Sequence, residues 1–185
     1  PALDLRFKII GDGELRAELE EFTQKLNLGS AVEFNGWQKD LSGVYADLDI
    51  VCLTSINEGT PVSLIEAMAS GKAVAATDAG GVKDLVGESL KASGDESGFT
   101  PSLETVEQPG SNKRLLTGFS ARERGILVRS GDADSFAGAL SFLVRNEEIR
   151  KKTAIAGREF VREKFAKERL IKDIERLYEQ IITLP

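Results

Sequence analysis

Two glutamates, Glu58 and Glu66, are the residues of this sequence best placed to do chemistry. Glu58 lies in a polar loop after an apolar run, and Glu66 lies eight positions later, two turns into a predicted helix. Pro61 stands at the predicted first helical position, where its fixed φ suits the helix and its missing N–H is no loss. A carboxylate in a loop and a second one in the following helix suit a ligand that carries hydroxyl groups.

The start of the same helix suits an anion. The first turn of a helix leaves backbone N–H groups without a partner inside the helix, which we expect around Thr60, Val62 and Ser63. The helix dipole adds roughly 0.3–1 kcal/mol for a negative charge there. Recognition of hydroxyls and of a phosphate in one crevice predicts a nucleotide or a nucleotide-sugar as the ligand.

The elements around these residues alternate between strand and helix. Apolar runs at 49–54 and 73–77 predict strands, and the helix that starts at Pro61 and runs through residues 62–69 ends at Gly71. A glycine turn at Gly80-Gly81 leads into another helix. Such units build parallel sheets, which bind ligands at the carboxyl ends of their strands. We therefore predict an α/β fold, a Rossmann-like parallel sheet with helices on both faces.

The flanking sequence continues this alternation. Upstream we predict strands over 5–10 and 31–34 and helices over 14–26 and 40–46. Downstream we predict a strand over 125–128 and helices over 133–144, 147–165 and 167–182, with Gly131-Asp132 as the cap of the first helix. The apolar stripe of the last helix is interpreted as core packing. Residues 87–125 are rich in Ser, Gly, Pro, Glu and Lys and lack periodicity, which predicts an insertion or flexible loop.

Composition excludes several classes of function. The 185 residues, 41% hydrophobic and 29% charged, fit one globular domain. A formal net charge of −6 argues against nucleic acid as a partner. The absence of histidine excludes a Ser-His-Asp triad and nearly all zinc sites. The single cysteine, Cys52, lies in an apolar run, so we expect a buried, unreactive thiol and a reducing, cytoplasmic location.

Residues 58–81, EGTPVSLIEAMASGKAVAATDAGG, resemble the donor-binding signature of the retaining glycosyltransferases of family four, which have the GT-B fold. The resemblance continues in IIGDGELRAELEEF, EFNGWQKDLSGVYADLDI and GILVRSGDADSFAGAL and covers most of the chain. It implies that residues 1–185 are the C-terminal donor-binding domain of such an enzyme. The implied reaction transfers a hexosyl unit from a UDP-, GDP- or ADP-hexose to a polysaccharide, glycolipid or other acceptor, with retention of configuration.

The resemblance also assigns roles to residues. Glu58 is implied to be catalytic, holding a hydroxyl of the donor sugar and steadying positive charge on its ring. Glu66 is implied to accept hydrogen bonds from the ribose hydroxyls. Trp37 either lines the base pocket or packs as a surface aromatic, and the turn at 11–13 is implied to lie near the donor diphosphate. Beside Glu66, the implied donor-binding residues are Gly11, Gly13, Trp37, Gly59, Thr60, Pro61, Val62 and Ser63. No cofactor beyond the substrate and no metal ion are expected.

Two departures limit this transfer of roles. Thr60-Pro61 stand where the common form of the family has Phe-Gly, and proline offers no amide to the sugar, so donor contact differs there or is missing. The family's diphosphate-binding Arg and Lys and its acceptor domain would lie upstream of Pro1. We therefore expect a fragment that is inactive alone, with its acceptor bound through a missing N-terminal domain and with peripheral association at the inner face of a membrane. The resemblance also implies that the last helix crosses back onto that domain, so part of its apolar stripe is expected to be exposed in the fragment.

Three alternatives stay open at this point. A GT-B-fold sugar-nucleotide 2-epimerase would also bind a nucleotide-sugar, but it matches the two glutamates and their flanks less well. A non-catalytic nucleotide-sugar binding module would bind the donor without transferring it. A Rossmann dehydrogenase is the weakest alternative, because the turn Gly11-Asp12-Gly13 is not the dinucleotide fingerprint GxGxxG.

Overall fold

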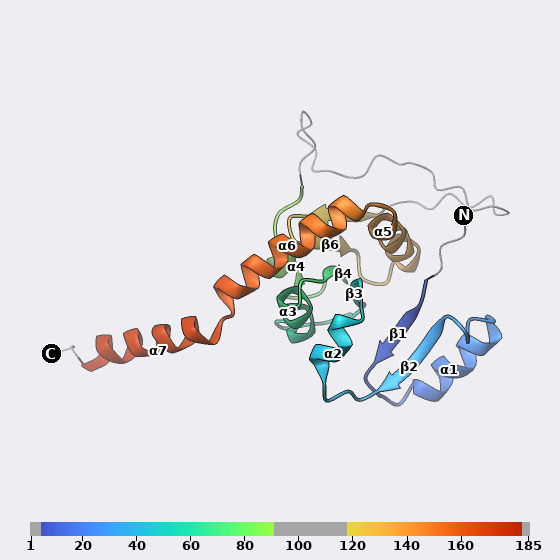
Figure 1. Cartoon of the computed structure of the whole chain (residues 1–185), viewed down its shortest axis with the longest axis horizontal. Coiled ribbons are helices and arrows are strands. Elements are labelled where there is room, and N and C mark those ends of the chain that lie inside the picture. Colours follow the sequence, from blue (N-terminus) through green and yellow to red (C-terminus); the bar gives the residue numbers. More distant parts are fainter. Residues whose placement is uncertain (1–4, 91–117, 183–185) are drawn as a thin grey trace. The chain divides into compact units, whose positions relative to one another are not determined.

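The computed structural model describes residues 5–90 and 118–182 (Figure 1). The chain divides into two compact units, residues 1–47 and 48–185. Both units are built from parallel strands joined by helices, so the predicted α/β fold class is confirmed. The single donor-binding domain expected from the sequence stays a prediction.

The first unit contains β1 (Phe7–Ile10), α1 (Arg16–Lys25), β2 (Val32–Gly36) and α2 (Leu41–Ala46). Strands β1 and β2 pair in parallel, with Phe7 opposite Val32. All four elements were predicted, and each predicted end lies within two residues of the observed end. The unit buries little: α1 has no buried residue, and the side chains of β1 are exposed.

The second unit contains the larger sheet, in the order β3-β4-β6-β5. Its strands are β3 (Ile50–Leu53), β4 (Ala73–Thr77), β5 (Phe119–Arg122) and β6 (Gly125–Val128). Its helices are α3 (Val62–Ala69), α4 (Val82–Val86), α5 (Ala133–Arg145), α6 (Glu147–Lys164) and α7 (Lys167–Ile182). Strands β3, β4 and β6 are parallel, and β5 is antiparallel to β6.

Strand β4 lies at the centre of this sheet and is buried along its whole length. Its successive side chains point to opposite faces. Ala75 joins the core cluster that Phe136 and Leu143 of α5 complete. Val74 points the other way, and it and Val86 of α4 both lie against Gly125. Helices therefore cover both faces of the sheet, as predicted.

The predicted loop over 87–125 contains a strand that sequence analysis missed. Strand β5 forms an antiparallel hairpin with β6, with Phe119 opposite Val128. Phe119 and Ala121 belong to the buried core, whereas Ser120 and Arg122 alternate with them on the half-buried side. The prediction was wrong here because four alternating residues are too short a run to stand out among polar neighbours. Residues 91–117 of the predicted loop lie outside the described residues.

Two apolar segments are less buried than core packing predicts, the stripe of the last helix and the run that contains Cys52. No residue of α7 is buried, and Leu170, Ile174 and Leu177 are 55%, 44% and 55% exposed, so the described residues leave its apolar stripe uncovered. The side chain of Cys52 on β3 is exposed rather than buried. Desolvation by the surrounding protein nevertheless raises the pKa of the Cys52 thiol to about 11. Exposure governs the access of a reagent, while the raised pKa keeps the thiol protonated near neutral pH.

Asp132 is the N-cap of α5, as predicted. Its carboxylate accepts hydrogen bonds from the Ser135 backbone N–H at 2.9 Å and from the Ser135 hydroxyl at 2.7 Å. The same hydroxyl accepts a bond from the Gly118 N–H at 3.1 Å, which ties the start of the hairpin to the helix. The two bonds from Ser135 hold the pKa of the Asp132 carboxyl below its usual range, and the bond from the backbone N–H has the larger effect.

We predict that Asp132→Ala lowers the thermal unfolding midpoint at pH 7. Because the folded-state pKa is depressed, the stabilisation is present above the unfolded-state pKa of about 3.9 and is lost as pH falls through the folded-state value. The difference between wild type and variant should therefore shrink at acid pH, as followed by circular dichroism. Asp134→Ala, in the same first turn, is the matched control. A difference that stays constant down to pH 2 would contradict this account.

Candidate functional site at the carboxyl end of the sheet

Three loops leave the larger sheet at the same end, the carboxyl end of its parallel strands. Because β3, β4 and β6 are parallel, the segments that follow them, residues 54–61, 78–81 and 129–132, leave the sheet at the same end. This edge is where open α/β sheets bind ligands. The loop after β3 carries Glu58, and the helix that follows, α3, carries Glu66.

Helix α3 begins one residue later than predicted. Pro61 has an extended ψ of 102° and is the N-cap, and its carbonyl accepts bonds from Leu64 at 3.1 Å and Ile65 at 3.3 Å. Because its ψ is extended, Pro61 is the last residue of the loop and not the first residue of the helix. At the other end Gly71 has φ +71°, the left-handed conformation predicted for the helix stop.

One face of α3 packs into the protein and the other stays open. Leu64, Ala67 and Met68 are fully buried. Val62, Ser63 and Glu66 share the opposite side, because residues three and four apart lie on one helix face. Val62 and Ser63 are exposed and Glu66 is half-buried. The predicted ligand-binding residues of this helix thus lie on its accessible face.

The residues before the helix are placed in the same way. Glu58 is half-buried, whereas Gly59 and Thr60 are exposed and Pro61 is buried. No atom lies within 4 Å of the place where a side chain on Gly59 would begin, so the loop has open space beside it. The structure therefore brings Glu58 and Glu66 together in one loop–helix element with Thr60, Val62 and Ser63.

The loop after β3 is held by the end of β4. The buried Thr77 hydroxyl donates to the Ser55 carbonyl at 2.5 Å. The Gly81 N–H donates to the Gly59 carbonyl at 3.0 Å. Gly80 has φ +51°, and a Cβ on Gly80 would lie 1.7 Å from the carbonyl oxygen of Glu58. Glycine is required there twice over, by the backbone conformation and by the contact.

Sequence analysis took Gly80-Gly81 for a turn and missed this contact. A Cβ on Gly81 would also lie 2.5 Å from the Gly59 carbonyl oxygen, so both glycines press against the backbone that carries Glu58. The available signal was the position of the pair, directly after a strand whose carboxyl end faces the Glu58 loop. We name residues 77–81 the loop clamp.

The remaining predicted residues, Gly11, Gly13 and Trp37, belong to the first unit. The Gly11 N–H donates to the Gly36 carbonyl at 2.8 Å, and Gly11 has φ +114°. Trp37 is 82% exposed, so it lies on the surface of this unit with little of its side chain covered. Its role in a base pocket stays a prediction.

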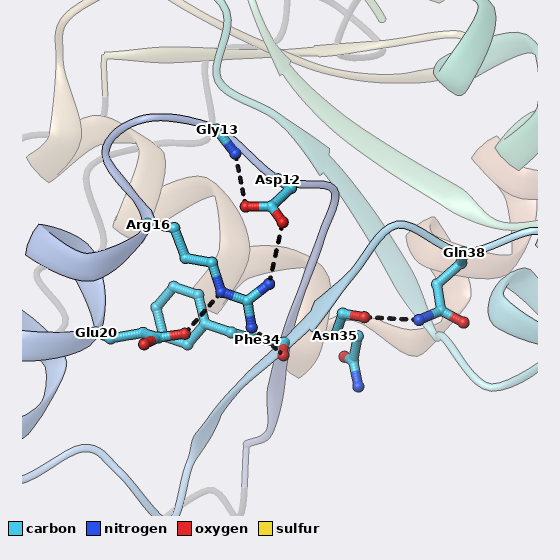
Figure 2. A network of polar contacts seen from close by, with 7 residues as sticks. All are labelled: Asp12, Gly13, Arg16, Glu20, Phe34, Asn35 and Gln38. Carbon is cyan, nitrogen blue, oxygen red and sulfur yellow. Dashed lines mark hydrogen bonds and ion pairs between the residues drawn. The ribbon is translucent and has the colours of Figure 1, made fainter.

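The turn that contains Gly11 and Gly13 is braced by a polar network (Figure 2). Arg16 lies 3.5 Å from the Asp12 carboxylate, pairs with Glu20 at 2.8 Å and donates to the Phe34 carbonyl at 3.2 Å. The Glu20 hydrogen bond is the main cause that raises the pKa of Arg16. The guanidinium is thus occupied by this unit's own acceptors, which favours a structural role for it.

Absences can be stated for the described residues only. In residues 5–90 and 118–182 no group of three or more Cys, Asp or Glu side chains is arranged to hold a metal ion. None of the helices in these ranges is both long and apolar enough for a membrane span. The expectation that no metal ion takes part stays a prediction.

The family model for glycosyl transferases group 1 matches residues 1–108 of the chain. The chain belongs to this family.

Relatives in this family have diverse names. An uncharacterized glycosyltransferase of Methanocaldococcus jannaschii is 25% identical over 181 residues, which are 97% of this chain and 42% of that protein. The 2-deoxystreptamine glucosyltransferase of Streptomyces kanamyceticus is 33% identical over 120 residues, 61% of this chain and 28% of its own length. The chain spans about two fifths of the length of the first of these relatives.

Solved structures confirm the fold. Anabaena HepE in complex with UDP superposes with a TM-score of 0.71 at 20% identity, over 97% of this chain and 41% of HepE. The C-terminal domain of LpcC from Francisella tularensis, a group 1 glycosyl transferase, gives a TM-score of 0.59 at 24% identity, over 82% of this chain and 63% of that one. The predicted half of a GT-B fold is confirmed.

We predict that Gly80→Ala lowers the free energy of unfolding of this group 1 chain by about 1–3 kcal/mol, because it adds backbone strain and a clash with the Glu58 carbonyl. Urea unfolding measures the change. Gly59→Ala is the matched control, since its Cβ meets open space, and it should stay within about 0.5 kcal/mol of wild type. Equal stability of the two variants would show that the loop clamp does not hold the Glu58 loop.

Proposed function

We propose that the chain is the donor-binding part of a retaining glycosyltransferase that transfers a hexosyl unit from a nucleotide-sugar. The observation that carries the proposal is the arrangement of the loop and helix after β3. Glu58 and Glu66 lie in one element at the carboxyl end of a parallel sheet, and Glu66 shares the accessible face of α3 with Val62 and Ser63. The loop clamp fixes the backbone that presents Glu58.

Glu66 is proposed to bind the ribose of the donor. Glu66 is half-buried, and buried residues on the opposite side anchor its helix, so its position is fixed while part of the residue stays accessible. A hydrogen bond from a hydroxyl to an ionised acceptor contributes about 1.5–3 kcal/mol. Two ribose hydroxyls on one carboxylate would therefore form a substantial part of the donor affinity.

The first turn of α3 is proposed to face the donor diphosphate. Val62 begins the helix and is 63% exposed, and its backbone N–H has no helical partner. In sugar transfer, negative charge builds on the departing diphosphate, and fixed donors aimed at that charge usually contribute the largest catalytic effect. Pro61 has no N–H and its side chain is buried, so this role begins at residue 62. No metal ion is invoked.

Glu58 is proposed to act at the donor sugar. A retaining transfer passes through a transition state with positive charge on the sugar ring, and a carboxylate held beside the ring stabilises that charge. The loop clamp fixes the Glu58 backbone through two backbone contacts, so the carboxylate can be held in position before the sugar arrives. Preorganisation of this kind supports catalysis because it needs no rearrangement during the reaction.

The comparisons support the ligand class. HepE was crystallised with UDP and, in another crystal, with UDP-glucose, and both structures superpose on this chain with TM-scores of 0.71 and 0.67. The N-acetyl-α-D-glucosaminyl L-malate synthase of Bacillus anthracis and the lipopolysaccharide core glycosyltransferase LpsE of Rhizobium meliloti are 23% and 26% identical to it. A polysaccharide or glycolipid acceptor, bound through polypeptide outside this chain in the cytoplasm, is part of the proposal.

We predict that the chain binds one of UDP, GDP or ADP selectively, and that Glu66→Ala weakens this binding about 10-fold or more, since it removes a charge-assisted acceptor. Isothermal titration calorimetry with the three nucleotides and their hexose conjugates measures both effects. The matched control is Glu159→Ala, which removes an exposed carboxylate from α6. Equal affinity of wild type and Glu66→Ala would remove Glu66 from the site.

We predict that Glu58→Gln in the full-length enzyme lowers kcat by about 10²–10³-fold while the donor Kd changes little, because the charge acts on the transition state more than on the bound donor. Single-turnover transfer from the nucleotide-sugar that binds measures kcat. Asn57→Ala, an exposed neighbour in the same loop, should leave kcat within a few-fold of wild type. A raised Kd with unchanged kcat would make Glu58 a binding residue only.

A further inference from the structure

The exit of strand β2 is held through three successive backbone carbonyls. The carbonyls of residues 34, 35 and 36 accept hydrogen bonds, in that order, from the Arg16 guanidinium at 3.2 Å, the Gln38 side-chain amide at 2.7 Å and the Gly11 N–H at 2.8 Å. Figure 2 shows the first two of these bonds. Connecting segments are usually more mobile than the elements they join. The three bonds instead fix the backbone that leads into Trp37.

Trp37 follows this backbone directly, and the first unit covers little of its side chain. Aromatic side chains stack with other flat rings, nucleobases included. A ring carried by a fixed backbone loses less entropy on binding than a mobile one. The held exit of β2 therefore suits Trp37 to receive a flat ring.

The Arg16 guanidinium lies where the turn after β1, helix α1 and the end of β2 come together. Besides the Phe34 carbonyl, it contacts the Asp12 carboxylate of the turn at 3.5 Å and the Glu20 carboxylate of α1 at 2.8 Å. It also lies against Gly36, where a Cβ would be 3.1 Å from Nη1 of Arg16. A planar group with five N–H donors serves acceptors in several directions at once, which a lysine ammonium does not do in the same fixed geometry.

The bond to Phe34 separates this arrangement from an ordinary helix ion pair. Pairs between residues four apart, such as Arg16 and Glu20, are common on helix surfaces and stabilise only the helix. Phe34 lies 18 residues from Arg16 in the sequence, on a different element. Arg16 therefore links α1 and its turn to β2, and loss of this link is expected to free the exit of β2 while α1 stays formed.

Donor contacts are predicted from the sequence at Gly11, Gly13 and Trp37. These residues lie on the two segments that Arg16 joins. We propose that Arg16 is a positioning residue of the donor site, which holds the turn at 11–13 and the exit of β2 in the arrangement that a nucleotide requires. Its guanidinium is occupied by the protein's own acceptors, so it acts through the backbone and not on the donor itself. The inference rests on the proposed function and extends it to a residue that contacts no donor.

Arg16→Lys tests the proposal in the 185-residue chain. The variant keeps the positive charge but loses the planar set of contacts, so we expect it to bind UDP, GDP or ADP, whichever the wild type binds, about tenfold more weakly. Isothermal titration calorimetry measures the affinity, and circular dichroism checks that the variant stays folded at the temperature of the titration. Lys25→Gln is the matched control, because it removes an exposed ion pair with Glu21 from the same helix and should leave the affinity unchanged.

Trp37 fluorescence tests the positioning step without any nucleotide. Trp37 is the only tryptophan in the chain, so its anisotropy decay reports motion at this position alone. We expect a larger amplitude of fast motion in Arg16→Lys than in the wild type or in Lys25→Gln. Asp12→Asn loses the ion pair with Arg16 but keeps an oxygen for the bond from the Gly13 N–H, so its amplitude should lie in between.

The two measurements separate this proposal from the proposed function. Equal nucleotide affinity of the wild type and Arg16→Lys would overturn the positioning role, and so would equal motion of Trp37 in the two proteins. A folded wild-type chain that binds none of the three nucleotides would instead overturn the proposed function. The anisotropy comparison would then still decide whether Arg16 fixes the exit of β2.

Discussion

The contact between the Gly80 backbone and the Glu58 carbonyl is the constraint on which the candidate site depends. It joins two loops that leave neighbouring parallel strands, and it leaves no room for a side chain on Gly80. Thr77 adds its hydroxyl bond to Ser55, and Gly81 adds its N–H bond to Gly59. A loop with an exposed glycine and threonine would otherwise be free to move, so these backbone ties convert it into a rigid support for a carboxylate.

Much of this arrangement could be predicted from the sequence because it depends on local signals. Residues that are close in the sequence determine each of these features: the apolar run at 73–77, the helix stop at Gly71 and the capping aspartate at 132. Glu58 and Glu66 could be singled out for the same reason. Their spacing along one loop and one helix fixes where they lie once the helix forms.

What the sequence could not predict depends on partners that are distant along the chain. The apolar alternation of β5 acquires meaning only beside β6, and the contact of Gly80 with Glu58 requires two loops more than twenty residues apart to meet. The stripe of α7 and the apolar Cys52 both suggested burial, yet both are exposed in this chain. An amphipathic or apolar pattern predicts that a residue packs against an apolar neighbour, but it does not identify that neighbour.

The loop clamp acts through main-chain atoms, and this separates the shape of the site from its chemistry. Ile56, Asn57 and Thr60 are exposed, and Gly59 has open space beside it. The contacts of the loop clamp are made to the carbonyls of Ser55, Glu58 and Gly59 and involve none of these side chains. Members of a family that share the clamp are therefore free to exchange residues here and to diverge in the sugars they accept without rebuilding their scaffold. A laboratory library randomised at these positions would explore specificity at little risk to folding.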